Sequence, residues 1–223
     1  PVNAIYLLSG KQDRGLRRLR RLAEASQIPV HYVDEQFFRD NAGGRSHGGV
    51  MAGAGPRRFL PLEELVTAHE NPFIVMLDGI EDPFNFGQAV RALYAAGASG
   101  LVVRPRNWLS AAAVVTRSSA GASELMRTAV ADTALQAAET FRGRGLTVAC
   151  TARDSATPLY QADLSAPIFL LIGGEKRGIT RSFLDQADLK LQIPYGRSFA
   201  HSLGTAASSA VIAFEILRQR SAP

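Results

Sequence analysis

Short apolar runs alternate with segments of helical spacing along the chain after residue 72. Runs rich in β-branched and aromatic residues, which are typical of buried strands, occupy residues 73–77, 100–103, 146–150, 168–172 and 189–193. Helices are expected between and after these runs, at residues 86–96, 110–120, 133–143, 180–186 and 202–219. Strands that alternate with helices predict an α/β fold with a mainly parallel sheet and helices on both of its faces. In such a sheet, ligands bind beyond the carboxyl ends of the strands.

The first 40 residues carry a separate strand–helix–strand–helix pattern. A strand is expected at 4–8, and the segment 31–38 follows a turn signal at Ile28 and Pro29. Between them, apolar side chains have helical spacing at Leu16, Leu19, Leu22 and Ala23. The other side of the same helix carries Arg14, Arg17, Arg18 and Arg21. Such a stripe either neutralises RNA phosphates or is an ordinary solvated helix face.

Glycine and proline mark the boundary between the two patterns. Residues 42–56 are too glycine-rich for a helix or the interior of a regular strand, so we expect a loop there. A short helix that ends before Pro72 follows, which places the boundary near residue 70. The predicted organisation is a small αβ domain at 1–55, a linker at 56–70 and a larger domain at 71–223.

The composition is that of an ordinary globular protein, with 46% hydrophobic and 20% charged residues. It disfavours a disordered chain, a collagen-like repeat and a disulfide scaffold. No stretch approaches the roughly 20 apolar residues of a membrane helix, and residues 1–14 lack the pattern of a signal peptide, so we expect no membrane partner. The single cysteine, Cys150, excludes an intramolecular disulfide and fits a reducing cytoplasm.

Charge and metal-ligand residues narrow the classes of partner. The formal charge of +5 is carried mainly by arginine, whose planar fork suits phosphate, so nucleic acid is one expected partner. No GxGxxG follows the first strand and no GxxxxGK(S/T) is present, which disfavours a dinucleotide site and a P-loop. The histidines are scattered and one cysteine cannot build a thiolate zinc site, so we expect no metal.

Polar residues flanked by glycine follow three of the expected strands. In the first loop, Asn85 stands where a helix should begin, so it is either an N-cap or a site residue. Arg91 lies six residues later among apolar neighbours. A long cation in such a place needs a partner, which is either a phosphate or a buried carboxylate.

The second and third loops carry weaker signals when each is taken alone. The second runs from an apolar strand into Gly173, Gly174 and Glu175. Paired glycines let a backbone approach a ligand closely, and a simple turn with a surface glutamate is the alternative. In the third, Ser202 opens a long helix, either as its N-cap or as a site residue. Small residues at 206–210 permit close packing, in the core or at a subunit interface.

Taken together, the three loops resemble the signature motifs of the SpoU/TrmH family of RNA ribose 2′-O-methyltransferases, in the SPOUT superfamily. The segment DPFNFGQAVRALYAAG resembles the first motif, with Asn85 and Arg91 in the matching places. The segment IGGEKRGI resembles the second motif, with Glu175 matching its glutamate. The segment IPYGRSFAHSLGTAASSAVIAFEILRQR resembles the third motif through Ser202 and Leu203.

The resemblance covers residues 72–220 and, through SHGGVMA, extends more weakly to residues 4–55. It implies a C-terminal trefoil knot of the SPOUT type and a small RNA-binding domain that is shorter at its start than in many members. It also implies a homodimer, with the cofactor pocket in the knot near the interface and arginine donated across it. The implied cofactor is S-adenosylmethionine, held largely by backbone at Thr151, Ala152, Gly173, Gly174, Ile193 and Leu203.

The catalytic residues that the resemblance implies are Arg91, Asn85, Glu175 and Ser202. We expect Arg91 to clamp a phosphate, orient the 2′-hydroxyl and stabilise developing alkoxide charge, because a guanidinium gives up its proton too reluctantly to act as a base. Asn85 would position Arg91, while Glu175 and Ser202 would hold that network and contact the substrate. The implied substrate is ribosomal or transfer RNA, and the separate N-terminal unit favours ribosomal RNA.

One position departs from the family pattern. The third motif usually reads Ser-Leu-Asn, whereas here Gly204 follows Leu203. The missing amide keeps two other hypotheses open: an RNA-binding protein of this fold that lacks catalysis, and methylation of a substrate other than ribose. A shifted loop would let His201 or Thr205 take over the role of the amide.

Overall fold

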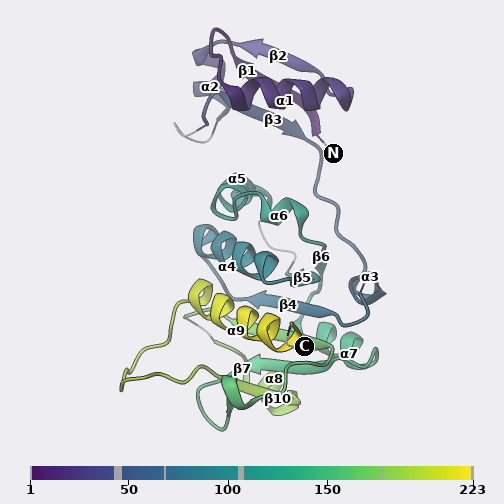
Figure 1. Ribbon diagram of the computed structural model, residues 1–223, viewed down its shortest axis with the longest axis vertical. Helices are drawn as coiled ribbons and strands as arrows, with labels where there is room; N and C mark the ends of the chain where they lie inside the picture. The colour runs from purple at the N-terminus through teal and green to yellow at the C-terminus, as the bar shows by residue number, and fades with distance from the viewer. Residues whose placement is uncertain (1, 43–46, 68, 105–107, 177, 222–223) are drawn as a thin grey trace. The chain divides into compact units, whose positions relative to one another are not determined.

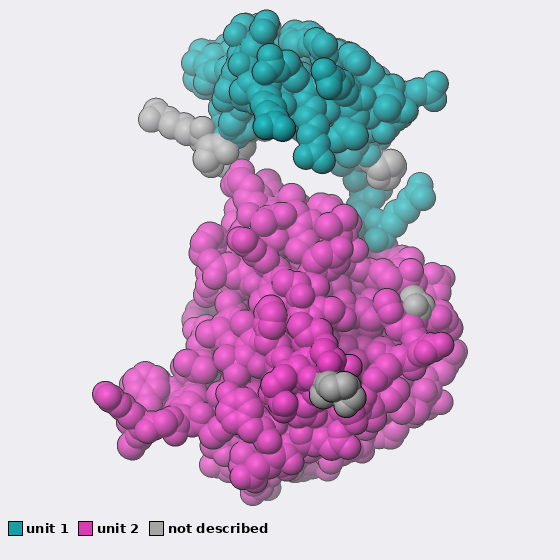
Figure 2. All heavy atoms as spheres, in the orientation of Figure 1, with its two compact units in different colours: residues 1–58 teal, residues 59–223 magenta. Residues whose placement is uncertain are grey.

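The fold is given by a computed structural model that describes residues 2–42, 47–67, 69–104, 108–176 and 178–221, with the backbone alone at 108–110. The chain divides into two compact units, residues 1–58 and 59–223, which Figure 2 shows in different colours. Each unit has its own buried apolar core.

The first unit contains a three-stranded sheet with the order β2-β1-β3. Its elements are β1 (Val2–Leu8), α1 (Arg14–Ala25), β2 (Val30–Val33), α2 (Glu35–Asn41) and β3 (Val50–Ala54). An aspartate begins each helix: Asp13 accepts a hydrogen bond from the Leu16 amide at 2.9 Å, and Asp34 accepts one from the Phe37 amide at 2.8 Å. The strand–helix–strand–helix order expected before residue 41 is confirmed.

The loop expected at residues 42–56 is wrong in its second half. Val50–Ala54 forms β3, which runs antiparallel to β1 along the edge of the sheet. Gly48 and Gly49 have positive φ angles and make the turn that leads into this strand. The glycines weaken the local strand signal, but pairing with β1 supplies the backbone hydrogen bonds that form the strand.

The second unit contains a seven-stranded sheet with the order β6-β5-β4-β9-β7-β10-β8. Its strands are β4 (Phe73–Asp78), β5 (Gly100–Val103), β6 (Thr128–Val130), β7 (Thr147–Thr151), β8 (Thr157–Pro158), β9 (Ile168–Gly173) and β10 (Leu189–Gln192). All of its strand pairs are parallel, as expected. The sequence did not predict β6 and β8, because strands of three and two residues are too short to carry a pattern.

Helices cover both faces of this sheet, which confirms the expected α/β architecture (Figure 1). On one face, α4 and α9 lie side by side and pack on Val75 and Leu77 of β4. On the other face, α3, α7 and α8 pack on Ile74 and Met76 of the same strand. The helices are α3 (Leu62–Thr67), α4 (Pro83–Ala95), α5 (Trp108–Ser118), α6 (Ala122–Leu125), α7 (Ala134–Arg142), α8 (Arg181–Gln186) and α9 (Thr205–Arg220), with a 3₁₀ turn, η1 (Leu159–Gln161).

Part of the segment that we expected to be a linker, residues 56–70, is packed into the second unit. It contains α3, in which Leu65 is fully buried. The amide of Leu60 donates a hydrogen bond to the carbonyl of Thr128 at 2.9 Å. The two compact units therefore divide between residues 58 and 59.

The strand order places late strands between early ones. β9 lies between β4 and β7, although it follows both in the chain, and β10 lies on the far side of β7. Such an order needs crossover connections near the C-terminal end and is compatible with a threaded path. The trefoil knot itself stays a prediction.

A substitution at Phe169 tests the packing of the sheet that carries the site. Its side chain is fully buried, and its ring centroid lies 4.8 Å from that of Phe141. We expect Phe169→Ala to lower the free energy of unfolding by about 3–5 kcal/mol, because it leaves a cavity in the core. Denaturant unfolding measures this, with Phe199→Ala as the control, since the Phe199 side chain is 57% exposed. Equal stability of the two variants would contradict the packing.

Candidate active site

The loops that follow β4 and β9 are in direct contact at the carboxyl edge of the sheet. The two strands end in register, with Asp78 opposite Gly173, and the Gly174 amide donates to the Asp78 carbonyl at 2.7 Å. A Cβ atom on Gly174 would overlap the carbonyl of Gly79, and one on Gly173 would lie 2.8 Å from Ile179 Cγ1. The contact between the two loops therefore requires glycine at 174, and the packing of the loop after β9 on itself requires glycine at 173.

A hollow in the second unit brings residues of the three sequence motifs together. It is lined by Asn85, Gln88, Ala92, Glu175, Gly204, Ala206, Ala207 and Ala210. The first motif contributes the α4 residues, the second contributes the glutamate, and the third contributes the start of α9. The small residues of α9 lie where this helix packs against α4, and they leave the hollow open beside that contact.

Asn85 lines this hollow and does not cap α4. The N-cap is Asp82, whose carboxylate accepts hydrogen bonds from the amides of Phe84 at 3.0 Å and Asn85 at 3.3 Å. Pro83 follows the cap in the first turn, where its missing N–H would have no intrahelical partner. The N-cap interpretation of Asn85 is therefore wrong, and its half-buried side-chain amide remains available to the site.

Arg91 lies on α4, three residues after Gln88 and therefore on a neighbouring part of the same helix face. Its side chain is exposed, and it forms no ion pair with any residue that the structure describes. A buried carboxylate, the structural alternative for this cation, is thus not found among those residues. The guanidinium is free to bind an external anion such as a phosphate.

Glu175 holds the start of α9. The helix begins at Thr205, and its N-cap residue, Gly204, has no side chain to cap it. Glu175 Oε1 instead accepts a hydrogen bond from the Thr205 amide at 3.2 Å, which places a carboxylate at the positive end of the helix. A Cβ atom at position 204 would lie 3.0 Å from that same oxygen. Glycine at this position therefore gives the carboxylate room to approach the helix.

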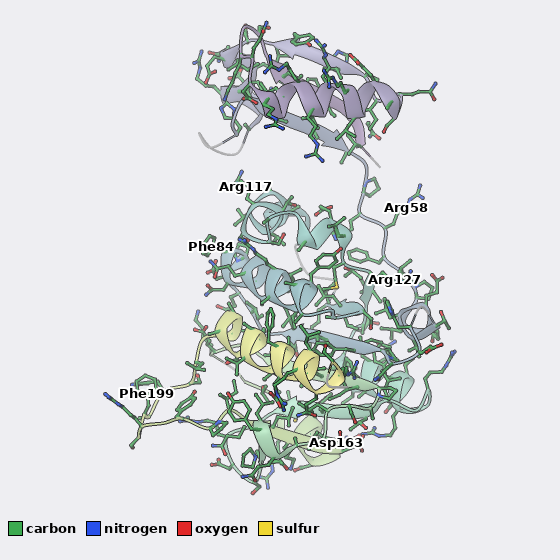
Figure 3. All side chains as sticks on the ribbon, viewed as in Figure 1. Arg58, Phe84, Arg117, Arg127, Asp163 and Phe199 are labelled. Carbon is green, nitrogen blue, oxygen red and sulfur yellow. The ribbon has the colours of Figure 1, made fainter. Side chains whose placement is uncertain are left out.

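Ser202 lies in the loop between β10 and α9, where it is exposed and does not cap the helix. The N-cap interpretation of Ser202 and the helix start at residue 202 are both wrong, because the capping group comes from Glu175. Figure 3 shows Phe199 at the outer end of this loop, pointing away from the rest of the second unit. His201 packs edge-on against the Phe199 ring at 5.4 Å, so it takes part in the loop's own packing.

One contact within this loop and one with a neighbouring loop hold it, and the sequence revealed neither. The Leu203 amide donates to the Tyr195 hydroxyl at 2.9 Å, and the Arg153 guanidinium donates to the Ala200 carbonyl at 2.7 Å. The second contact joins the loop after β10 to the loop after β7. No local pattern marks this second contact, because it depends on how the neighbouring strands β7 and β10 bring their loops together.

The residues expected to hold the cofactor follow three strands that lie next to one another. β9, β7 and β10 are neighbours, and they end at Gly173, Thr151 and Gln192. The Ala152 amide donates to the Leu191 carbonyl at 2.9 Å, which ties the end of β7 to β10. The structure therefore brings these backbone segments to one edge of the sheet.

The arginines of α1 belong to the first unit. Buried Leu16 and Ala23 form the inner side of this helix. The arginines expected to contact RNA are all exposed and form no ion pair with a residue in the described ranges; they are Arg14, Arg17, Arg18 and Arg21. By contrast, Arg20 pairs with Glu24 at 3.4 Å. The stripe is a free cationic surface, and RNA binding by it stays a prediction.

Other site types find no support in the part of the chain that the structure describes. Within it, no cluster of three potential metal ligands is found, and no helix is long and apolar enough to span a bilayer. Burial raises the pKa of the Cys150 thiol to about 11, so this group stays protonated and unreactive near neutral pH.

The contact of Glu175 with Thr205 generates a prediction about α9. Glu175→Ala removes both the acceptor and the charge at the helix start, so the free energy of unfolding should fall by about 0.5–1 kcal/mol. The Thr205 amide should also exchange faster with solvent. Glu175→Gln keeps an acceptor oxygen and should lose less. Denaturant unfolding and amide hydrogen exchange measure these effects, with Glu139→Ala, an exposed glutamate of α7, as the control. Unchanged exchange at Thr205 in Glu175→Ala would refute the contact.

Comparisons with known proteins identify the family and the fold. The SpoU rRNA Methylase family matches residues 72–214. A 23S rRNA (guanosine-2′-O-)-methyltransferase, RlmB of Pseudomonas aeruginosa, is 32% identical over 98% of this chain and 89% of its own length. Two solved structures share the fold. An AdoMet-bound rRNA methyltransferase from Sinorhizobium meliloti has a TM-score of 0.81 at 23% identity, covering 97% of this chain and 80% of that one. The SpoU methyltransferase AviRb from Streptomyces viridochromogenes, in complex with AdoMet, has a TM-score of 0.82 at 21% identity, covering 99% and 83%. The family inferred from the three motifs is thereby confirmed, and this chain belongs to the SpoU rRNA methylase family.

Proposed function

We propose that this protein uses S-adenosylmethionine to methylate the ribose 2′-hydroxyl of a guanosine in 23S ribosomal RNA. The observation that carries the proposal is the meeting of Asn85, Glu175 and the start of α9 in one hollow, with the unpaired cation of Arg91 on the same helix as Asn85. The choice of RNA and of base is supported by relatives named 23S rRNA (guanosine-2′-O-)-methyltransferases. An enzyme with this substrate works where ribosomes assemble, so we expect it in the cytoplasm.

The carboxyl edge of β7, β9 and β10 fits the cofactor. Ile193 and Leu203 are half-buried there and offer an apolar wall for an adenine ring. Small residues and exposed backbone offer the polar contacts that an adenosine and a methionine moiety need. S-adenosylmethionine supplies an electrophilic methyl group attached to a good leaving group. The residues that we assign to its site are Thr151, Ala152, Gly173, Gly174, Ile193 and Leu203.

Arg91 is the residue to which we assign the central catalytic role. Its guanidinium keeps its proton in proteins, so it acts as a fixed cation and a fork of donors. Held against the phosphate next to the target ribose, it would orient the 2′-hydroxyl toward the methyl group. The same charge would stabilise the negative charge that develops on the hydroxyl oxygen as its proton leaves.

Asn85, Glu175 and Ser202 support that arrangement in different ways. The Asn85 amide lines the hollow on the same helix as Arg91 and can hold the ribose or its phosphate. Glu175 fixes the start of α9 through Thr205, which sets the position of the loop that precedes it. Ser202 is exposed in that loop and can donate a hydrogen bond to the substrate.

A second copy of the chain is the partner that we propose besides RNA. The second unit exposes large apolar side chains on α4 and α9, the helices that line the hollow: Tyr94 is 41% exposed, Phe214 is 49% exposed and Leu217 is 36% exposed. Exposed apolar groups of this size on neighbouring helices favour burial in an interface. A homodimer formed through these helices would place two hollows near the same interface.

The alternative function, RNA binding without catalysis, rests on Gly204. The structure explains why glycine stands at this position: a side chain there would crowd the Glu175 oxygen that caps α9. The Glu175 carboxylate thus lies directly beside the position that an asparagine occupies in the usual family motif. Catalysis with Gly204 is therefore compatible with the geometry, and the transfer assay decides between the two functions.

Arg91→Ala should reduce methyl transfer by at least about 100-fold, because it removes the cation that orients the hydroxyl and stabilises its charge. Affinity for S-adenosylmethionine, measured by calorimetry, should stay near that of the wild type. The assay is transfer of labelled methyl to total RNA from a strain that lacks the enzyme, with modified nucleosides identified by mass spectrometry.

The matched control for this assay is Arg144→Ala, which removes an exposed arginine from the turn between α7 and β7, at the amino ends of the strands. It should keep full activity. Full activity of Arg91→Ala would refute the assigned role. No transfer by the wild type, with cofactor and RNA still bound, would favour the non-catalytic alternative, and methyl groups found on transfer RNA alone would change the substrate.

The α1 stripe generates a second prediction, for RNA affinity. Replacing Arg14, Arg17, Arg18 and Arg21 by glutamine should weaken RNA binding and flatten its salt dependence. The slope of log K against log salt should fall by about 0.7–0.9 for each arginine that contacts a phosphate. Binding of ribosomal RNA fragments measured between about 50 and 200 mM salt checks this. Arg20→Gln, which breaks the pair with Glu24, is the control on the same helix. An unchanged slope in the quadruple variant would identify the stripe as a solvated face.

A further inference from the structure

A cavity of about 500 Å³ lies at the carboxyl ends of β4 and β5, and none of the residues that we assign to the cofactor lines it. Its volume is within the range of ligand pockets, about 300–1,000 Å³. Ile80, Phe86 and Val115 give it apolar walls, while Asp78, Glu81 and Arg104 give it charged groups. Apolar walls with a few convergent polar groups are typical of ligand sites, including those that hold a base turned out of its stack.

Glu81 is paired with Lys176 at 2.7 Å, whereas Asp78 and Arg104 form an ion pair that is only partly satisfied. Arg104 Nη2 donates to Asp78 Oδ2 at 2.8 Å, and the side chains are 35% and 20% exposed, respectively. Arg104 Nε is buried and finds no acceptor among the described residues. The other carboxylate oxygen of Asp78 accepts no hydrogen bond from them either. Both residues line the cavity, so the free carboxylate oxygen of Asp78 and the remaining guanidinium donors of Arg104 are polar groups that a ligand there would meet.

A purely structural role explains this pair less well. β4 and β5 are already joined by their own parallel ladder, so the sheet does not need a side-chain link at this point. Partly exposed ion pairs contribute little to stability, about 0–1 kcal/mol. A purely structural ion pair would also not account for the cavity that both residues line.

Guanine is the base that complements a carboxylate beside a guanidinium. Its Watson–Crick edge carries two adjacent donors, N1–H and the N2 amino group, followed by the acceptor O6. A carboxylate accepts and never donates, and a guanidinium donates and never accepts. Adenine has an acceptor at N1, and uracil and cytosine have only one donor on this edge. None of them matches two donors and an acceptor in that order.

The position of the cavity also fits a target base. Asp78 is bonded through its carbonyl to the Gly174 amide, directly before the glutamate of the second motif. Pro83 lines the cavity, and Asn85, two residues later on α4, lines the hollow. The first turn of α4 therefore separates the two spaces. A nucleotide turned out of its stack can put its base in the cavity and its ribose toward the motif residues.

We propose that this cavity binds the guanine base of the target nucleotide, with Asp78 accepting from N1–H and the N2 amino group and Arg104 donating to O6. The inference rests on the proposed function, and it adds the site that selects the base. Asp78 and Arg104 are specificity residues in this assignment, while Arg91 acts on the ribose and its phosphate.

The test uses the full chain, the variant Asp78→Asn and the control Asp185→Asn, which makes the same change at an exposed carboxylate of α8. Since Arg104 can only donate, the introduced amide would turn its oxygen to Arg104 and its NH₂ toward the base. That NH₂ would oppose the two donors of guanine. Inosine, which lacks only the N2 amino group, is the matched probe for the second donor.

The first readout is binding of GMP, IMP and AMP at millimolar concentration, measured by saturation-transfer NMR, which needs no methyl transfer. The wild type and Asp185→Asn should bind GMP about tenfold more tightly than IMP, as expected for one hydrogen bond to a charged group, and more tightly than AMP. Asp78→Asn should lose this preference. A wild type that does not prefer GMP would overturn the inference.

The second readout is methyl transfer to transcripts with guanosine or inosine at the mapped target. The ratio of kcat/KM values should be about ten or more for the wild type and should fall to one or below for Asp78→Asn. An unchanged ratio in an active Asp78→Asn enzyme would overturn the base site and leave the proposed function standing. No transfer by the wild type would instead overturn the proposed function, and the nucleotide readout would still decide on the cavity. Weaker S-adenosylmethionine binding by Asp78→Asn would place the methyl donor in the cavity and also overturn the inference.

Discussion

The loops after β4 and β9 meet at a backbone contact, with the Gly174 amide 2.7 Å from the Asp78 carbonyl oxygen and no room for a Cβ atom on Gly174. This contact fixes the chain at the point where two parallel strands end together. On one side, the Asp78 side chain lines the cavity at the ends of β4 and β5. On the other, Glu175 follows Gly174 directly and reaches the start of α9. One backbone contact thus sets the positions of Asp78, which lines the cavity, and of Glu175, which lines the hollow.

The sequence predicted the parts of the fold whose signal is local. Buried parallel strands are apolar along their whole length, so a run such as 168–172 predicted β9 (Ile168–Gly173) within one residue. β3 was missed because Gly53 within it and the glycines before it weaken the local signal of a strand that forms through pairing with β1. The start of α9 was placed too early because Ser202 is a good N-cap by type. The group that caps this helix lies 30 residues away in sequence, in the loop after β9.

The same distinction applies to the site. The motifs identified Asn85 and Glu175, and the structure brings both to one hollow. The sequence did not predict their local contacts. Asp82, and not Asn85, caps α4, and Glu175 caps a helix that belongs to another motif. The pair of Asp78 and Arg104 could not be found at all. These residues are 26 positions apart and meet only because β4 and β5 are neighbours in the sheet.

Pairing with carboxylates sorts the arginines of this chain by what they can bind. Arg142 and Arg218 are paired with Asp188 and Glu215, which satisfies part of their donor set and lowers their attraction for a second anion. Arg91 has no such partner among the described residues, so its full charge is available to a phosphate. Arg104 is different again, because it has a carboxylate partner and still keeps a buried donor. The Asp78 carboxylate beside it would repel a phosphate but would accept hydrogen bonds from the donors of a neutral base. Two arginines near one site are therefore suited to two parts of one nucleotide, Arg91 to its charged backbone and Arg104 to its neutral ring.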